Sequence, residues 1–396
     1  MTDQLTITAL GHKGEGVAEH QGARVFVPLT LPGETVTARI EKDRGQLLDI
    51  LSPSDRRIAP FCAHFGGCGG CQLQHLERGL YEEFKRDLAA TPLRRLGIDT
   101  PIGALIDARG EGRRRATLHA RREGAGFMAL KSHQVHDLDR CPILVKALEP
   151  APAIVRAIGQ ATGECDVALT ATLTGLDVNV RVKRAREDRL LPLLARFGLA
   201  RLAVNGDVLV QQAAPEIAMG KATVRLPVAS FLQATQEAEE RLAQLVIEGV
   251  GKVKSVADLF CGVGPFALRL AQTAKVLAHD SDKPAIAALA GATRTASGLK
   301  PIAAAPRDLF RDPMTRYELE TLDAVVIDPP RAGAQAQMTE LAASKVKRIV
   351  SVSCDPGTFA RDAAILLGGG YRLEQVTPVD QFAYSAHLEL VGVFSR

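Results

Sequence analysis

The strongest constraint on the fold is a pattern that occurs twice near the C-terminus, a short apolar run followed by a polar residue and proline. Residues 349–353 (Ile-Val-Ser-Val-Ser) precede Cys354 and an Asp-Pro pair, and residues 325–327 (Val-Val-Ile) precede Asp328 and two prolines. Short β-branched runs that stop at proline predict buried strands. Open α/β sheets bind their ligands at the carboxyl ends of the strands. The pattern therefore places a thiol and a carboxylate at one edge of a sheet.

A glycine turn between two further predicted strands indicates a nucleotide-like ligand. Residues 253–259 lead into a Gly262-x-Gly264 turn, and residues 275–279 form a second apolar run that ends at Asp280. A close backbone and a helix start suit such a ligand, and an acid about twenty residues further on suits ribose hydroxyls. The turn is too short for a dinucleotide fingerprint, and its Asp-x-Phe-x-Gly-x-Gly pattern is that of S-adenosylmethionine sites. The predicted fold class is α/β, with a doubly wound, Rossmann-like methyltransferase sheet.

The N-terminal part has a different pattern. Residues 5–51 alternate short apolar runs with turn signals, which predicts a small, OB-like β-barrel. Such barrels often carry single-stranded nucleic acid, although a structural cap is an equally good interpretation of the strands alone. We expect three domains: a barrel at 1–55, a central α+β domain at 56–225, and a catalytic domain at 226–396.

Three cysteines within ten residues, separated by glycines, predict a metal-binding loop, and a distant Cys-Pro supplies a fourth thiol. Four thiolates suit an iron–sulfur cluster or tetrahedral zinc. The spacing differs from the paired gaps of structural zinc sites, so we favour a 4Fe–4S cluster. His64 and His75 are alternative ligands, but ordinary polar loop positions explain them better. The predicted ligands are Cys62, Cys68, Cys71 and Cys141.

Basic residues gather in two runs, at residues 109–140 and 181–189. A run of charge is usually a solvated face, yet arginines beside a metal loop and a small barrel suit phosphate contacts, and we favour RNA contact. The formal net charge of +4 is too small to indicate a polyanion partner by itself.

The composition argues against a disordered, membrane-spanning or disulfide-rich secreted protein. With 46% hydrophobic and 24% charged residues among 396, the chain is expected to be soluble and globular. Neither a targeting pattern nor a bilayer-length apolar run is present, so we expect a cytoplasmic protein without a membrane partner. Seven cysteines, an odd number, do not suggest a secreted disulfide framework. We expect a monomer.

Five segments in order, Gln233 and residues 258–264, 328–333, 353–356 and 379–389, resemble those of the RNA (uracil-5-)-methyltransferases. The resemblance covers nearly the whole chain and includes an N-terminal segment similar to the TRAM barrel. The four-cysteine pattern favours the 23S ribosomal RNA branch over the bacterial tRNA branch. The resemblance implies an RNA substrate, with 23S rRNA favoured and tRNA as the alternative.

The same resemblance implies roles for individual residues. Cys354 is the nucleophile and Glu389 the base, and the glycines of the turn bind the cofactor. The chain departs from the family at Pro265, where asparagine often contacts the cofactor. The residues implied to line the cofactor or target pocket are Gln233, Phe260, Gly262, Gly264, Asp280, Asp308 and Asp328.

The chemistry explains these residue types. Carbon 5 of uracil becomes nucleophilic when a thiolate adds at carbon 6, and a carboxylate then accepts the carbon 5 proton. One alternative is an amino-group methyltransferase that uses the Asp328-Pro-Pro turn and needs neither Cys354 nor Glu389. Another is an RNA-binding iron–sulfur protein that keeps the cofactor fold only for structure. The intact thiol, carboxylate and glycine turn argue against it.

Overall fold

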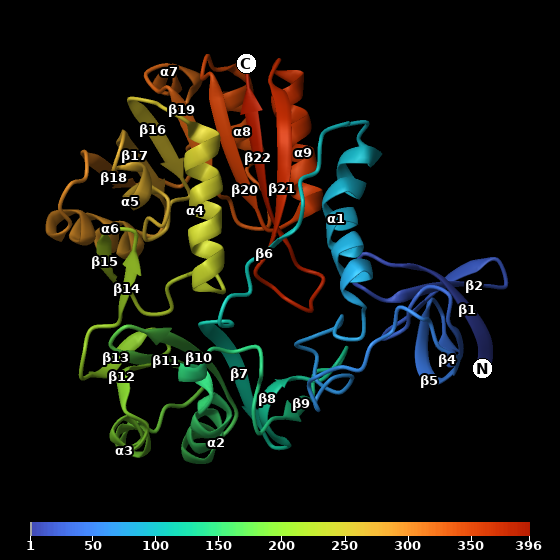
Figure 1. Cartoon of the computed structure of the whole chain (residues 1–396). Helices are drawn as coiled ribbons and strands as arrows, with labels where there is room; N and C mark the ends of the chain where they lie inside the picture. The colour runs from blue at the N-terminus through green and yellow to red at the C-terminus, as the bar shows by residue number, and fades with distance from the viewer. Residues whose placement is uncertain (1) are drawn as a thin grey trace.

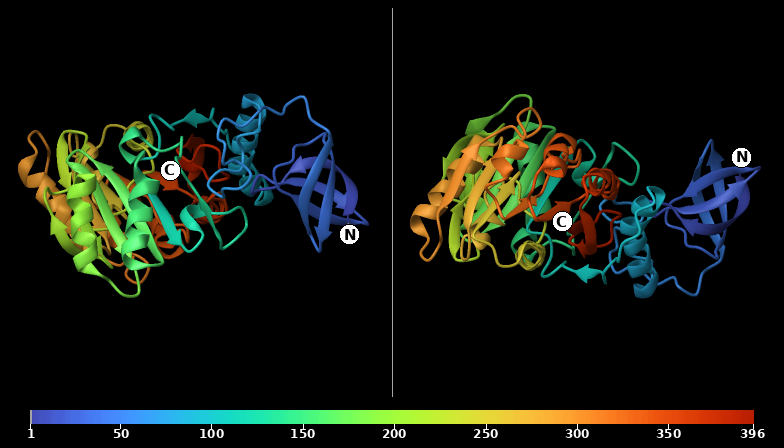
Figure 2. Two further views of the ribbon diagram at one scale, coloured as in Figure 1. Left: turned by 90° about the horizontal axis from the view of Figure 1, so that it is seen from below. Right: turned by 90° about the horizontal axis from the view of Figure 1, so that it is seen from above.

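The computed structural model describes residues 2–396, which form a small barrel and two larger lobes (Figures 1 and 2). The barrel closes in the order β1-β2-β3-β5-β4. Alternating side chains fill it, as Leu5 and Ile7 of one strand and Val36 and Ala38 of another are buried. The predicted small barrel is therefore confirmed. Its strands are β1 (Thr2–Leu10), β2 (Gly16–His20), β3 (Ala23–Val27), β4 (Thr35–Glu41) and β5 (Arg44–Ser52).

The lower lobe in Figure 1 is a seven-stranded sheet of order β13-β12-β11-β10-β7-β8-β9, packed against two helices. The amphipathic helices α2 (Ala151–Thr162) and α3 (Glu187–Phe197) bury their apolar stripes on the sheet. A 3-10 turn, η1 (Lys146–Leu148), precedes α2. The strands are β7 (Arg115–Arg121), β8 (Gly124–Met128), β9 (Val135–Asp137), β10 (Cys165–Thr172), β11 (Gly175–Arg181), β12 (Leu199–Val204) and β13 (Asp207–Gln211).

The upper lobe is an eight-stranded sheet of order β18-β17-β16-β19-β20-β22-β21-β6 with helices on both faces, which confirms the doubly wound prediction. One face carries α4 (Gln236–Val250), α5 (Ala267–Leu270) and α6 (Lys283–Thr295), and the other carries α1, α7 (Arg316–Leu319), α8 (Gln335–Ala343) and α9 (Pro356–Gly368). The strands are β16 (Ser255–Leu259), β17 (Lys275–Asp280), β18 (Ile302–Pro306), β19 (Ala324–Ile327), β20 (Arg348–Ser353), β21 (Arg372–Asp380) and β22 (Glu389–Ser395).

Three short pieces join the parts. The helix α1 (Arg78–Arg95) follows the cysteine-rich segment and packs on β21 and α9, and β6 (Ile106–Asp107) pairs with β21. A hairpin of β14 (Glu216–Met219) and β15 (Ala222–Arg225) packs on α6. Both α1 and β6 precede residue 226, where the predicted catalytic domain begins, yet α1 packs on the upper sheet and β6 pairs within it. The three-domain division therefore stays a prediction.

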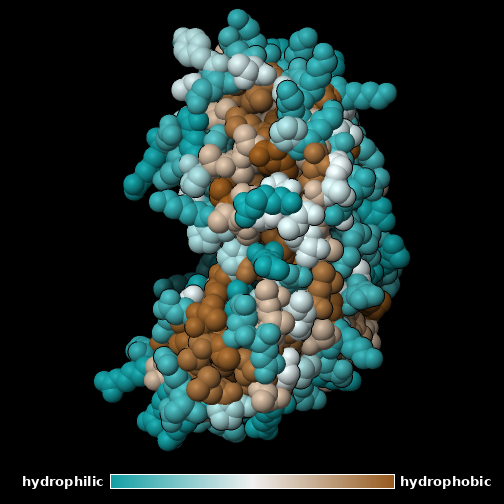
Figure 3. Space-filling view, turned by 90° about the vertical axis from the view of Figure 1, so that its left-hand side faces the viewer, coloured by the Kyte–Doolittle hydropathy of each residue, from teal (hydrophilic) through white to brown (hydrophobic). Residues whose placement is uncertain are grey.

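The space-filling view shows a notch between the two lobes and a hydrophobic patch on the lower one (Figure 3). Exposed apolar side chains of the lower lobe include Leu173 and Val208. None of the described helices is both long enough and apolar enough to cross a membrane.

Candidate active site

Cys354 and Glu389 lie opposite each other at one edge of the upper sheet. The strands β20 and β22 are antiparallel, and Ser353 pairs with Leu390. The next step of this register brings Cys354 level with Glu389, the first residue of β22. Asp355 then ends the strand and caps α9. The carboxyl ends of β16, β17 and β19 reach the same edge, because these strands run parallel to β20.

Burial controls the protonation of the acidic groups in this site. It raises the pKa of the Cys354 thiol to about 11, an effect that the charges of Glu389 and Asp328 increase and that of Arg331 reduces. Burial also raises the pKa of Glu389 to about 8, with a further contribution from Asp328. The pKa of Asp328 is raised to about 7 by burial and by Asp280. At neutral pH the Cys354 thiol and the Glu389 carboxyl are therefore mostly protonated in the free protein.

The Gln381 side chain connects Glu389 to Gln233. Its Nε2 donates to Glu389 Oε1 at 2.9 Å and to Gln233 Oε1 at 2.6 Å, while its own Oε1 accepts from the Ala234 N–H. All three side chains are buried. The Gln233 side-chain oxygen accepts this bond, and among residues 2–396 its amide N–H groups donate to no partner. They are therefore available as donors to a ligand.

The loop between β21 and β22 is held from outside the sheet. The fully buried Lys85 of α1 donates to Asp380 Oδ1 at 2.8 Å and to the His387 carbonyl at 2.6 Å. The backbone N–H groups of Gln72 and the next residue donate to the Tyr384 carbonyl. The loop between β21 and β22 is therefore fixed by α1 and by the cysteine-rich segment.

The glycine turn has the backbone that a close ligand requires. Phe260, Gly262 and Gly264 have φ of +62°, +52° and +91°, and the non-glycine value is a strained conformation typical of functional sites. A Cβ at Gly264 would lie 2.4 Å from Leu289 Cδ1. The Gly262 N–H donates to Asp280 Oδ2 at 2.9 Å, so the predicted acid and the predicted turn meet.

Two further aspartates surround the turn. Asp258 is completely buried, and neither of its oxygens has a hydrogen-bond partner among the described residues. Burial, together with the charge of Asp328, raises the pKa of Asp258 well above its ordinary value. Asp308 follows β18 and accepts from the N–H of Phe310, whose ring lies 5.3 Å from that of Phe260. Pro265, which follows the turn, has no N–H to offer a ligand.

A cavity of about 370 Å³ is lined by Arg113, Arg115 and Phe382 among others. The Arg115 guanidinium stacks on Phe231 at 4.5 Å, and its Nε is buried without a partner in the described part of the chain. Burial lowers the pKa of Arg115 to about 10, partly offset by the charge of Glu389. Arg115, a member of the predicted basic run, therefore lies within electrostatic range of Glu389.

The four predicted thiol ligands surround one small pocket in the lower lobe. Burial raises the pKa of Cys71 to about 11 and that of Cys141 to about 12. Among residues 2–396, no three His, Cys, Asp or Glu side chains converge tightly enough to hold a single metal ion. His64 contacts His136 and Asp139 instead.

Sequence reasoning did not assign three of these residues. Gln381 lies inside the recognised segment 379–389, which was the available signal for it. Arg115 belongs to a charge run that the sequence alone places on a surface. Lys85 lies on a helix with no distinguishing neighbours.

Comparisons with known proteins identify relatives of this chain. Residues 303–396 match the tRNA (Uracil-5-)-methyltransferase family model, and residues 2–49 match the TRAM domain. An uncharacterized RNA methyltransferase of Rhizobium meliloti (strain 1021) is 43% identical over all of both chains. The 23S rRNA (uracil(1939)-C(5))-methyltransferase RlmD of Shewanella sediminis (strain HAW-EB3) is 30% identical, over 98% of this chain and 95% of its own.

A solved structure has the same fold. The Pyrococcus abyssi tRNA (uracil-54, C5)-methyltransferase in complex with S-adenosyl-L-homocysteine superposes with a TM-score of 0.79 at 23% identity, covering 99% of each chain. Together with the full-length relatives, this places the chain in the family of S-adenosylmethionine-dependent RNA uracil-5-methyltransferases.

Proposed function

We propose that this enzyme forms 5-methyluridine in 23S rRNA, with Cys354 as nucleophile and Glu389 as base. The observation that carries the proposal is the register of β20 and β22, which sets the thiol and the carboxylate face to face. An amino-group methyltransferase needs neither group. The relative named for 23S rRNA supports the ribosomal substrate, and tRNA is the second candidate.

The proposed reaction balances through these two residues. The Cys354 thiol loses its proton to solvent, the thiolate adds to carbon 6 of uracil, and the electron pair of the carbon 5–carbon 6 double bond forms an enolate. S-adenosylmethionine, when bound, supplies the methyl group, which bonds to carbon 5 while the sulfonium sulfur keeps the electron pair. Glu389 then removes the carbon 5 proton, the double bond re-forms, and the thiolate leaves. The donor amide of Gln233 and the Arg115 guanidinium are proposed to stabilise the enolate oxygen.

The cofactor is proposed to lie across the glycine turn. Gly262 and Gly264 let the backbone approach it, Asp280 accepts from the ribose, and Phe260 and Asp308 flank the adenosine. Asp328 faces the methyl-bearing end together with Gln233.

A 4Fe–4S cluster is proposed on Cys62, Cys68, Cys71 and Cys141. Their four thiols share one pocket, which fits such a group. A zinc ion would hold its sulfurs roughly 3.8 Å apart, given a Zn–S bond of about 2.3 Å. The cysteine spacing, which lacks the paired two-residue gaps of structural zinc sites, favours the cluster over a zinc ion. When bound, the cluster would tie the ends of the proposed central domain together.

A trapping experiment tests the mechanism. Glu389→Gln protein, incubated with substrate RNA and methyl-labelled cofactor, should transfer the methyl group and remain joined to the RNA as a slow band on a denaturing gel. The band should be absent when Cys354→Ala is added. Full turnover by Cys354→Ala would refute the nucleophile assignment. Mapping 5-methyluridine in both RNAs from a deletion strain decides between 23S rRNA and tRNA.

A further inference from the structure

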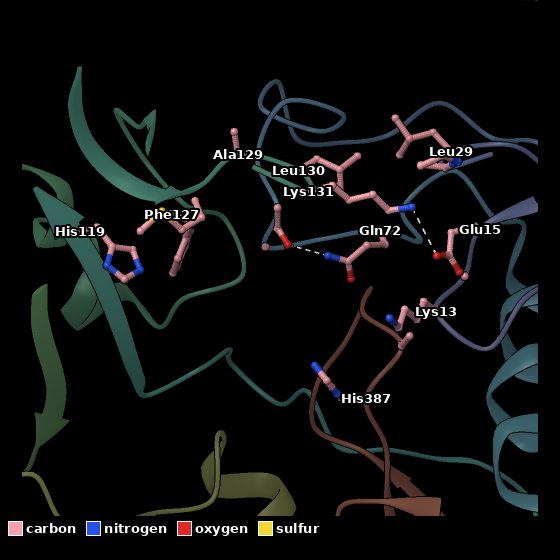
Figure 4. Close-up of a pocket in the computed structure, with 16 residues that line it drawn as sticks. Lys13, Glu15, Leu29, Gln72, His119, Phe127, Ala129, Leu130, Lys131 and His387 are labelled. Atoms are coloured by element: carbon pink, nitrogen blue, oxygen red, sulfur yellow. Dashed lines mark hydrogen bonds and ion pairs between the residues drawn. The ribbon is translucent and has the colours of Figure 1, made fainter. Parts of the chain in front are cut away.

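A cavity of about 470 Å³ lies where the barrel, the cysteine-rich segment, β8 and the loop between β21 and β22 meet. In Figure 4, Phe127 and His119 stand on one side, Lys13, Lys131 and Glu15 on the other, and His387 below. The volume is in the range of small-ligand pockets. Segments from all three parts of the molecule therefore contribute to one recess.

The wall of this recess is mostly apolar, and its charge is positive. Leu29, Phe127 and Met128 supply the apolar surface. Lys13 is exposed, and Lys131 extends from the lower lobe to the single carboxylate, Glu15, at 3.4 Å. That carboxylate also accepts from Arg44 of the barrel at 3.2 Å, so two cations share it and Lys13 has no ion-pair partner among residues 2–396.

The backbone of Lys131 is held in an uncommon conformation. Its φ is +53°, in the left-handed region that costs free energy for a residue with a Cβ. The side chain that this conformation presents is 42% exposed and makes only a long ion pair. Lys131 lies in the turn between β8 and β9, and an exposed ion pair of this length contributes little to stability, so its loss to a ligand would cost little.

The loop that leads to Glu389 lines the recess. His387 contributes to its wall and lies two residues before Glu389, so the Cα atoms of these two residues are at most about 7 Å apart. Phe127 lines both this recess and the 370 Å³ cavity that Arg115 also lines. The recess is therefore close enough to Glu389 for a nucleotide that neighbours a base placed there.

We propose that the recess binds an unpaired nucleotide next to the target uridine, with the base against Phe127 and Leu29 and a phosphate between Lys13 and Lys131. The proposal rests on the proposed RNA substrate and adds a second subsite to it. Any base has an apolar face that stacks on an aromatic ring, and a phosphate replaces the weak Glu15 contact at Lys131. An acidic peptide would meet the charges but not use the flat apolar wall.

The charge half of the proposal is tested with Lys13→Ala/Lys131→Ala protein and a 23S rRNA fragment that the wild type methylates. Binding at about 0.15 M salt should weaken roughly 10-fold, and the slope of log affinity against log salt should become shallower by about 0.7 per lost phosphate contact. Lys345→Ala, at an exposed lysine on the far end of the upper lobe, is the control. Unchanged affinity and slope in the double variant would overturn the subsite.

The base half is tested with abasic sites on either side of the target. At one of the two positions, the abasic RNA should bind the wild type about 10-fold more weakly than the intact RNA does. The Phe127→Leu protein should bind this abasic RNA and the intact RNA equally well. Equal losses in both proteins would place the base elsewhere. Calorimetric binding of S-adenosylmethionine to every variant checks the fold. The trapped adduct of Glu389→Gln is read separately, so failure of the mechanism and failure of the subsite are distinguished.

Discussion

The Gln381 amide nitrogen donates at 2.9 Å to the carboxylate of Glu389, at the point where the antiparallel register brings that carboxylate level with Cys354. The same nitrogen donates to Gln233. One buried side chain, that of Gln381, therefore holds the carboxylate of the proposed base Glu389. It also occupies the side-chain oxygen of Gln233, which leaves the Gln233 amide N–H groups free to donate. In this arrangement Gln381 is a positioning residue, because it acts through Glu389.

Replacement of Gln381 should change the pH dependence of one step only. The hydrogen bond from Gln381 lowers the pKa of Glu389, which burial has raised to about 8. In Gln381→Leu protein that pKa should rise further, so the pH at which adduct decay reaches half its maximal rate should move upward, with decay at pH 8 slower by about 10-fold. Single-turnover decay of the covalent adduct, followed from pH 6 to 10, measures this. Gln375→Leu, at an exposed position of β21, should leave the profile unchanged. An unshifted profile in Gln381→Leu would show that the amide is only a packing element.

The next prediction concerns Asp280 at the glycine turn, with Asp282, two residues further on, as the control. Asp280 accepts from the Gly262 and Asp282 N–H groups, so Asp280→Ala removes both the ribose contact and a support of the turn. Cofactor affinity by calorimetry should fall by at least about 10-fold. Asp282→Ala removes only the N-cap of α6 and should cost about 1 kcal/mol of stability with little change in affinity. Equal affinity losses in the two variants would point to general loosening of the turn.

The sequence predicted the parts of this molecule that local patterns determine. The buried runs before Asp328 and Cys354 are β19 and β20, and the glycine turn meets Asp280 as expected. The contacts between distant segments were not predictable. Lys85 and Asp380 are separated by 295 residues, and the pair exists only because α1 packs on β21. Arg115 belongs to a run of arginines that a sequence pattern cannot divide into buried and exposed members, and the fold alone turns it toward Phe231.

The four thiols give a prediction that separates ligands from other cysteines. Anaerobically purified protein should be brown and contain about four irons per chain, as a 4Fe–4S cluster requires. Cys71→Ser should lose most of this iron, because one ligand is removed from a pocket where four are needed. Cys165→Ala changes a buried cysteine in the core of the lower lobe and should retain the iron. Zinc in place of iron in the wild type would refute the cluster.

Stability should depend on pH through the buried base. The folded-state pKa of Glu389, about 8, lies above its ordinary value of 4.5, so the folded protein holds a proton that the unfolded chain releases. The stability associated with this proton is complete below about pH 4.5 and is lost as the pH rises through 8. Glutamine at this position cannot ionise, and its oxygen can still accept from Gln381. The Tm of Glu389→Gln minus that of the wild type should therefore increase from pH 5 to pH 8 and level off above it, by a few degrees in total. Differential scanning calorimetry over this range measures it, with Glu374→Gln as the control, because the pKa of that partly exposed carboxyl is lowered rather than raised. A difference that stays constant or shrinks with rising pH would mean that Glu389 is already ionised in the folded protein at neutral pH.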